Sequence, residues 1–158
     1  MVQRQRDIQP PVTLQMLKNH LHMFTDDFDQ QLEINLRAAV AKSENYINGV
    51  IWHGVQIVSV PFVNTVEISE PTAVINQVKV DGQQVDFIFV NGILSVQGSG
   101  KVLEYTLEAG YVQEDCPSDI QMAILLIAAK FFNNPVDNVE QLPTASQHLL
   151  HPYKRYNV

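Results

Sequence analysis

At 158 residues the chain is long enough for one domain with a real hydrophobic core, and its composition is ordinary for a globular protein. A single cysteine, Cys116, excludes an intrachain disulfide framework. The formal net charge is -7, with 10 Lys and Arg in total. This argues against a protein that binds nucleic acid, because phosphate binding needs clustered basic side chains.

Two helices are predicted at the start, over about residues 13–49. Thr13 has the side chain of an N-cap, and an apolar stripe follows it. Asp26 or Asp27 can cap the second helix, and Asn48 followed by Gly49 supplies a left-handed stop. We place these residues in the bundle core: Leu14, Leu17, Leu21, Phe28, Leu32, Leu36, Val40 and Ile47.

From about residue 50 to residue 112 the apolar period changes from that of a helix to two, which predicts an antiparallel β insertion. Three glycine-containing turns, at Asp81-Gly82, Asn91-Gly92 and Gly98-Ser99-Gly100, are expected to be hairpins. The predicted strands span residues 56–60, 64–68, 74–80, 85–89, 93–96 and 102–108.

A long apolar helix is predicted after the strands, within residues 117–151, with a shorter helical turn behind it. It starts after Pro117 and stops at Asn133, Asn134 and Pro135. Its apolar run is too short for a bilayer, which needs about 20 residues, and the N-terminus has no apolar run, so we expect no membrane segment. The core stripe is Ile120, Ile124, Ile127 and Phe131.

Apolar residues also cover much of the rest of this helix, although one small core does not need two apolar faces. Either the β module or another subunit is expected to cover this second face, because a large exposed apolar patch is a liability on a monomer. Its members are Met122, Leu125, Leu126, Ala129 and Phe132. The fold class is therefore α+β: a small helical bundle of two N-terminal helices and a long later helix, with an inserted antiparallel β module, in a single domain of residues 1–158.

The motifs that would indicate nucleotide binding, metal binding or nucleophilic catalysis are weak in this sequence. The Gly98 to Lys101 loop lacks the remaining residues of a phosphate-binding loop and opens no helix. The pairs His20 with His22 and His148 with His151 have no third ligand nearby for a metal. Cys116 precedes a helix start, whose dipole favours a thiolate, but no base can be placed beside it, so we interpret it as a buried or bystander cysteine.

Other polar and aromatic residues also have structural explanations. The acidic pairs at residues 26–27 and 114–115 precede helices, where capping explains them. Tyr46 and Trp52 are interpreted as a packing seam rather than a ligand platform, and Lys154 with Arg155 as a solubilising tail. We expect no catalytic residue, cofactor or metal.

An ordered set of segments resembles the head-tail connector, or adaptor, family of tailed bacteriophages and prophages. The matching segments run "VTLQMLKNHLHM", "DDFDQQLEINLRAAVAKSENYING", "SEPTAVINQVKVDG", "LEAGY", "CPSDIQMAILLIAAKFFNN" and "LPTASQHLLHPYK". The family's charged ending of the long helix is replaced here by Asn133 and Asn134, and its final motif by Pro152, Tyr153 and Lys154.

The resemblance implies a structural role in virion assembly. Such subunits form a homo-oligomeric ring below the portal protein, extend the DNA channel and dock a downstream head-completion or tail protein. DNA would pass without specific binding, and the protein would be made in the bacterial host cytoplasm and end at the head-tail interface of the virion. The alternatives are another head or tail completion protein, of stopper or tail-terminator type, or a small metal-dependent hydrolase.

Overall fold

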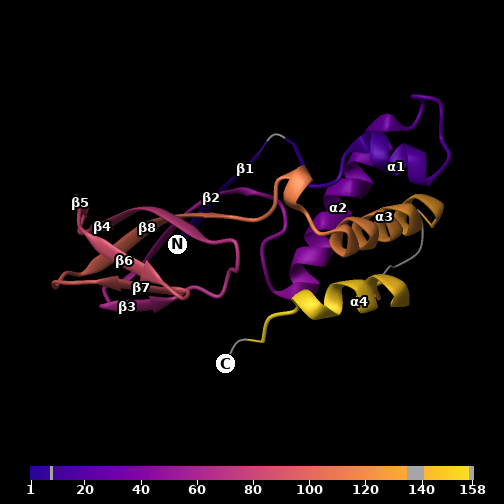
Figure 1. The fold of residues 1–158 in the computed structure, drawn as a ribbon. Coiled ribbons are helices and arrows are strands. Elements are labelled where there is room, and N and C mark those ends of the chain that lie inside the picture. Colours follow the sequence, from indigo (N-terminus) through magenta and orange to yellow (C-terminus); the bar gives the residue numbers. More distant parts are fainter. Residues whose placement is uncertain (8, 135–140, 157–158) are drawn as a thin grey trace. The chain divides into compact units, whose positions relative to one another are not determined.

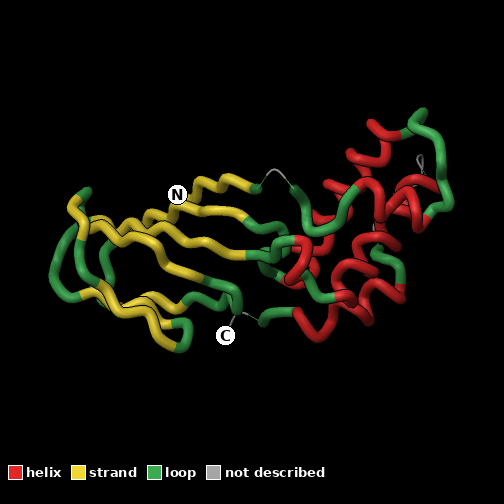
Figure 2. The backbone as a smooth tube through the Cα atoms, turned by 45° about the horizontal axis from the view of Figure 1, so that its top comes forward, coloured by secondary structure: helices red, strands yellow, loops and turns green. Residues whose placement is uncertain are grey.

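The computed structural model describes residues 1–7, 9–134 and 141–156. The chain divides into two compact units: residues 1–8 and 52–110 form a β unit, and residues 9–51 and 111–158 form a helical unit. Strands and helices are separated accordingly (Figures 1 and 2). The predicted α+β class is confirmed, with four α-helices and two antiparallel sheets in the described residues.

The helical unit contains α1 (Leu14–His20), α2 (Asp29–Ile47), α3 (Ser118–Asn133) and α4 (Thr144–Leu150), with 3-10 turns η1 (Gln113–Asp115) and η2 (His151–Tyr153). The Thr13 N-cap is confirmed, because its hydroxyl accepts the Met16 N–H at 3.3 Å. Asn48 ends α2 in the left-handed conformation, as expected. Pro135, part of the predicted stop after α3, lies outside the described residues.

The second helix begins differently from the prediction. It starts at Asp29 with Phe28 at the N-cap position and no side-chain capping bond, so neither Asp26 nor Asp27 caps it. Phe28 is 47% exposed and therefore does not belong to the core in which the sequence placed it. Its ring contacts the Phe132 ring edge to face at 5.6 Å between centroids.

The apolar surface of α3 is covered from three sides, because α1, α2 and α4 all contact this helix. Leu125, predicted to need the β module or another subunit, is buried at 7% exposure in this helical packing. Three residues predicted for the core are only half-buried: Leu14 at the start of α1, Leu21 directly after α1, and Phe131 in α3. The predicted core residues that are buried are Leu17, Leu32, Leu36, Val40, Ile47, Ile120, Ile124 and Ile127. Within the described residues no helix combines the length and apolarity needed to cross a bilayer.

The β unit is built from two antiparallel sheets. One has the order β1-β2-β8-β4-β5, from β1 (Val2–Arg6), β2 (Gly54–Pro61), β8 (Val102–Ala109), β4 (Val74–Val80) and β5 (Gln83–Gln84). The other has the order β3-β7-β6, from β3 (Thr65–Glu67), β7 (Ile93–Val96) and β6 (Phe87–Val90). The smaller sheet lies against one face of the larger one (Figures 1 and 2).

The core of the β unit lies between the two sheets. Alternate residues of β8, namely Leu103, Tyr105 and Leu107, are buried, and so are Leu94 and Val96 of β7. This period of two is what a strand with one covered face requires.

Two of the three predicted hairpins are confirmed. Asp81-Gly82 joins β4 to β5 and Asn91-Gly92 joins β6 to β7, and all four residues have the positive φ that this turn needs. Gly98-Ser99-Gly100 is not a hairpin, because it connects β7 of the smaller sheet to β8 of the larger one.

The N-terminal strand β1 was not predicted. It pairs antiparallel with β2 along its whole length, from Val2 opposite Val58 to Arg6 opposite Gly54. The strands approach so closely that a Cβ at Gly54 would lie 2.3 Å from the Gln5 carbonyl oxygen. Gly54 is therefore required by the neighbouring backbone.

We expect Leu125→Ala to lower the free energy of unfolding by about 2–5 kcal/mol, because it leaves a cavity among packed helices. Met122→Ala removes a side chain that is 44% exposed, so it should lower the free energy of unfolding by only about 0.5 kcal/mol. Urea unfolding of both variants measures the difference. Equal small losses would show that α3 is not packed as described.

Gly54→Ala should detach β1, because the new methyl group overlaps backbone that cannot move without breaking the β1–β2 pairing. Hydrogen exchange at Gln3 and Gln5 should accelerate. Gly49→Ala is the matched control, since a Cβ there meets only the flexible end of Arg155. Unchanged protection of β1 in Gly54→Ala would contradict the close approach.

Candidate assembly surfaces

An exposed apolar group remains on the helical unit after α3 has packed. Met122 is 44% exposed, and Leu126, Ala129 and Phe132 are half-buried. Phe28 extends this group through its contact with Phe132. Of the five α3 residues predicted to need cover, only Leu125 is therefore buried.

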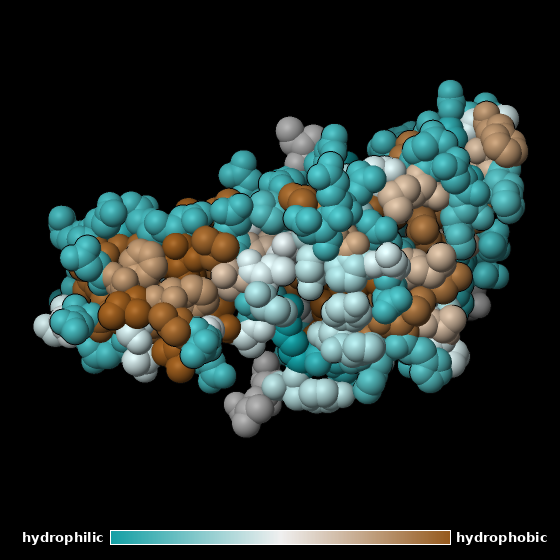
Figure 3. Space-filling view, in the orientation of Figure 1, coloured by the Kyte–Doolittle hydropathy of each residue, from teal (hydrophilic) through white to brown (hydrophobic). Residues whose placement is uncertain are grey.

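A second exposed apolar group lies on the β unit and was not predicted. Ile88 and Val90 of β6 are 63% and 57% exposed, and Ile93 of β7 is 47% exposed. Val90 pairs directly with Ile93 across the two strands, so the three side chains share the outer face of the smaller sheet. Figure 3 shows hydrophobic residues gathered over β6 and β7. The available signal was the unbroken apolar run of residues 87–90, which is unusual for an edge strand.

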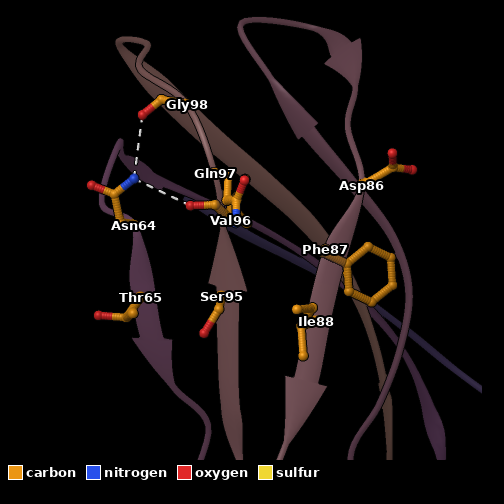
Figure 4. Close-up of a pocket in the computed structure, with 9 residues that line it drawn as sticks. All are labelled: Asn64, Thr65, Asp86, Phe87, Ile88, Ser95, Val96, Gln97 and Gly98. Carbon is orange, nitrogen blue, oxygen red and sulfur yellow. Dashed lines mark hydrogen bonds between the residues drawn. The ribbon is translucent and has the colours of Figure 1, made fainter.

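A pocket of about 600 Å³ opens at one end of the smaller sheet. Thr65, Ser95 and Ile88 come from its three strands, and Phe87 and Asp86 lie beside them (Figure 4). The Asn64 amide closes the end by donating to the carbonyl oxygens of Val96 at 3.1 Å and Gly98 at 3.2 Å. The lining mixes apolar and polar groups and includes one carboxylate, that of Asp86.

Cys116 does not have the properties of a nucleophile. Its side chain is buried, and burial raises the pKa of the thiol to about 12. The helix start therefore does not produce the thiolate that the sequence position allowed.

The paired histidines do not form a metal site in the described residues. His148 and His151 are exposed at the end of α4, and no group of three or more His, Cys, Asp or Glu side chains within residues 1–7, 9–134 and 141–156 is arranged to hold an ion. A different histidine, His53, has defined partners. Its Nδ1 lies 2.5 Å from an Asp7 carboxylate oxygen and its Nε2 lies 3.1 Å from one of Glu108, which ties the ends of β1, β2 and β8 together. No sequence signal links these three residues.

Asp26 acts in an ion pair instead of a cap. The Lys18 ammonium is almost buried and lies 2.5 Å from Asp26 and 2.8 Å from Asp29. The hydrogen bond with Lys18 holds the pKa of Asp26 below its ordinary value, and the same bond raises the pKa of Lys18. This ion pair closes the loop between α1 and α2.

The basic residues near the C-terminus are attached to the helical unit rather than forming a free tail. The Arg155 N–H donates to the Ile47 carbonyl at 2.8 Å, and the Lys154 ammonium lies 5.0 Å from the Tyr46 ring centroid. Trp52 belongs to the other unit, where Arg6 covers its indole ring at 5.2 Å. Trp52 and Tyr46 therefore pack in two separate units.

Comparisons with solved structures identify the fold. One chain, in the neck of an empty GTA particle computed with C6 symmetry, superposes with a TM-score of 0.82 over 100% of this chain and 97% of its own, at 17% identity. This is the fold of a particle neck chain. A neck chain of the native GTA particle, computed with C12 symmetry, gives 0.75 at 17% identity over 99% and 97% of the two chains. A chain of the native gene transfer agent virion gives 0.74 at 16% identity over 98% and 96%. No family model and no curated protein matches the sequence.

Asp26→Asn should lower the melting temperature at pH 7, because it removes the charge that pairs with the nearly buried Lys18. Since the folded-state pKa of Asp26 is lowered from 3.8, its contribution is present above that pH and is lost as the pH falls through the folded value. The difference in melting temperature between the wild type and the variant should therefore disappear at acidic pH. Calorimetry across pH measures it.

The same ion pair should weaken at the alkaline end as the pH rises above 10.5, since the pKa of Lys18 is raised from that value. Asp27→Asn is the matched control, because the ion pairs of Lys18 within the described residues are with Asp26 and Asp29. Identical pH profiles for the two variants would contradict this role of Asp26.

Proposed function

We propose that this chain is a structural head-tail connector subunit of a phage-like particle. Its copies form a ring below the portal protein, extend the DNA channel and dock a downstream head-completion or tail protein. The observation that carries this proposal is the agreement of fold over nearly the full length of both chains with neck chains of GTA particles. Those necks were computed with C6 and C12 symmetry, which supports a homo-oligomeric ring here.

The order of the elements favours a connector over a stopper or tail-terminator protein. Those proteins tend to be built mainly on β structure, whereas this chain places α1 and α2 before the strands β2 to β8. A hydrolase that uses Cys116 is disfavoured by the burial of the thiol, because a protonated thiol is a poor nucleophile.

The charge of the chain suits a channel through which DNA moves. With a net charge of -7 the protein repels the phosphate backbone instead of holding it. The basic residues Lys154 and Arg155 are engaged with Tyr46 and Ile47. We therefore assign DNA a passing role without specific binding, in a protein made in the host cytoplasm and incorporated in the virion.

The exposed apolar group on the helical unit is proposed to contact another subunit of the particle. Met122 and Phe28 are each nearly half exposed, and Leu126 and Phe132 are partly exposed beside them. Exposed apolar groups of this kind often mark protein–protein contact sites, so a neighbouring subunit is the expected partner.

The test is assembly of the purified chain with the portal protein encoded in the same genome, followed by native mass spectrometry and negative-stain imaging. We expect closed rings on the portal. Met122→Asp should reduce ring formation strongly while the fold is retained, because the side chain is already exposed. Gln30→Asp, at an exposed position of α2, should have no effect. A wild-type chain that binds neither portal nor itself would rule out the connector function.

A further inference from the structure

The loop between α1 and α2 presents an aromatic side chain to solvent. Phe24 is 89% exposed, and no other large apolar side chain in the described residues is more exposed. Asp26 and Asp27 follow it in the same loop, and both are exposed. The loop therefore combines one aromatic ring with two carboxylates. We call Phe24, Asp26 and Asp27 the knob.

The knob is held in place from both sides. Before it, the Met23 N–H donates to the Lys18 carbonyl at 2.9 Å, and His22 has a left-handed backbone. After it, the Asp29 N–H donates to the Asp26 carbonyl at 3.2 Å. The Lys18 ammonium contacts the carboxylates of both aspartates and closes the loop. A loop that is fixed before it binds loses little conformational entropy on binding, so this one suits a contact site.

A pocket of about 560 Å³ lies on the same helical unit, where α2 meets α4 and the segment before it. Lys42 and Tyr46 line the pocket from α2, and Leu142 and Gln147 line it from the other side. Its lining therefore offers an aromatic ring, an apolar side chain and an ammonium group. We call the residues that line this pocket the socket: Lys42, Asn45, Tyr46, Gln141, Leu142 and Gln147.

Three lysines surround the socket. Lys42 lines it, and the Lys154 ammonium lies 5.0 Å from the centroid of the Tyr46 ring. The Lys130 ammonium donates to the carbonyl of Gln141, another lining residue, at 3.3 Å. The whole chain has 10 Lys and Arg and a net charge of -7, so three lysines around one pocket are a concentration of positive charge on an acidic protein.

The knob and the socket match in chemistry. An aromatic ring such as that of Phe24 binds well against an ammonium group and against a second aromatic ring, and the socket offers both in Lys42 and Tyr46. The carboxylates of the knob complement the lysines around the socket. Glu44, the acidic residue of α2 nearest to Lys42 in sequence, is buried and accepts the Ile51 N–H at 3.0 Å. Its carboxylate therefore does not line the socket.

The knob and the socket lie at opposite ends of α2. The knob precedes Asp29, the first residue of this helix, whereas the socket begins at Lys42. At 1.5 Å per residue, about 20 Å of helix axis separates them. Figure 1 shows the loop between α1 and α2 and the helix α4 at opposite sides of the helical unit. One chain therefore cannot fill its own socket, and a head-to-tail contact between copies is the arrangement that brings the two together.

We propose that the knob of one copy occupies the socket of a second copy, with Phe24 against Tyr46 and Asp27 beside Lys42. The inference rests on the proposed connector function and names a contact between neighbouring copies of the ring. A second copy is the occupant because both halves of the contact, with opposite charges, are present on one chain. Since every copy carries a charge of -7, copies attract only where opposite charges meet.

Cysteine cross-linking in the presence of the portal protein tests this contact. Thr25→Cys, which leaves Phe24 intact, is combined in one chain with Asn45→Cys at the socket, and both positions are exposed. Oxidation should give a ladder of disulfide-linked oligomers, whereas either single variant should stop at dimers. Cys116 should stay unreactive because its side chain is buried.

The matched control combines Gln15→Cys with Ala145→Cys, at exposed positions of α1 and α4. A ladder no longer than that of the control would overturn the proposal.

Removal of the aromatic ring gives a second readout. Phe24→Ala in the double-cysteine chain should slow cross-linking by about tenfold, the loss expected for a central aromatic anchor. The melting temperature should stay unchanged, because the side chain is exposed. An unchanged rate of cross-linking would show that Phe24 does not enter the socket and would overturn the proposal.

Charge reversal tests the pairing of Asp27 with Lys42. Asp27→Lys in the double-cysteine chain should slow cross-linking by about twofold to fivefold, the range expected for an exposed ion pair. Adding Lys42→Glu should restore the rate. Failure of this restoration would overturn the assigned pairing of charges.

The portal assay separates the two proposals. Wild-type rings on the portal without a ladder from the double-cysteine chain would reject this contact and leave the connector function standing. A ladder in a protein that never binds the portal would do the reverse. Loss of portal binding in Phe24→Ala, again without a ladder, would assign the knob to the portal protein and overturn the contact between copies.

Discussion

The burial of α3 is the constraint on which the helical unit depends. This helix is apolar on nearly all sides, and α1, α2 and α4 surround it, so most of its surface leaves water within one chain. The short helices α1 and α4 have seven residues each and would not persist alone, because isolated helices of that length are marginal in water. They are held by contact with α3, and the loop after α1 is closed by Lys18 with Asp26 and Asp29. What remains exposed on α3 is a small apolar group around Met122.

The β unit follows a different rule, since two sheets shelter their inner faces and leave two outer faces in water. The N-terminal strand adds an edge to the larger sheet, and His53 ties the ends of three strands through two carboxylates. The smaller sheet ends in an apolar edge strand that lacks the charges that usually prevent association. Stability of the single chain does not explain that feature. The proposed connector function offers an explanation, because a subunit of a larger particle can complete its burial through a neighbour.

A connector needs rigid modules and contact surfaces that differ from one another, and it must not bind the DNA that passes through it. The fold shared with GTA neck chains, the exposed apolar groups on both units and the acidic balance agree with these needs. Chemistry is not required, and the thiol that the sequence placed at a helix start is buried and protonated. The proposed role therefore depends on surfaces rather than on an active site.

The sequence by itself determined what short-range chemistry controls. The Thr13 cap, the Asn48 stop, the strands at residues 74–80 and 93–96 and two tight turns follow from neighbouring residues. Tertiary structure decided the rest. The burial of Leu125 depends on the helices packed around α3, of which α1 and α2 are distant in sequence. Strand β1 forms only because β2 offers an edge to a polar segment without alternation. Asp26 pairs with Lys18 across a loop, and the exposed apolar group on β6 and β7 exists because the register puts Val90 beside Ile93. Local patterns specify elements, but exposure is a property of what packs against them.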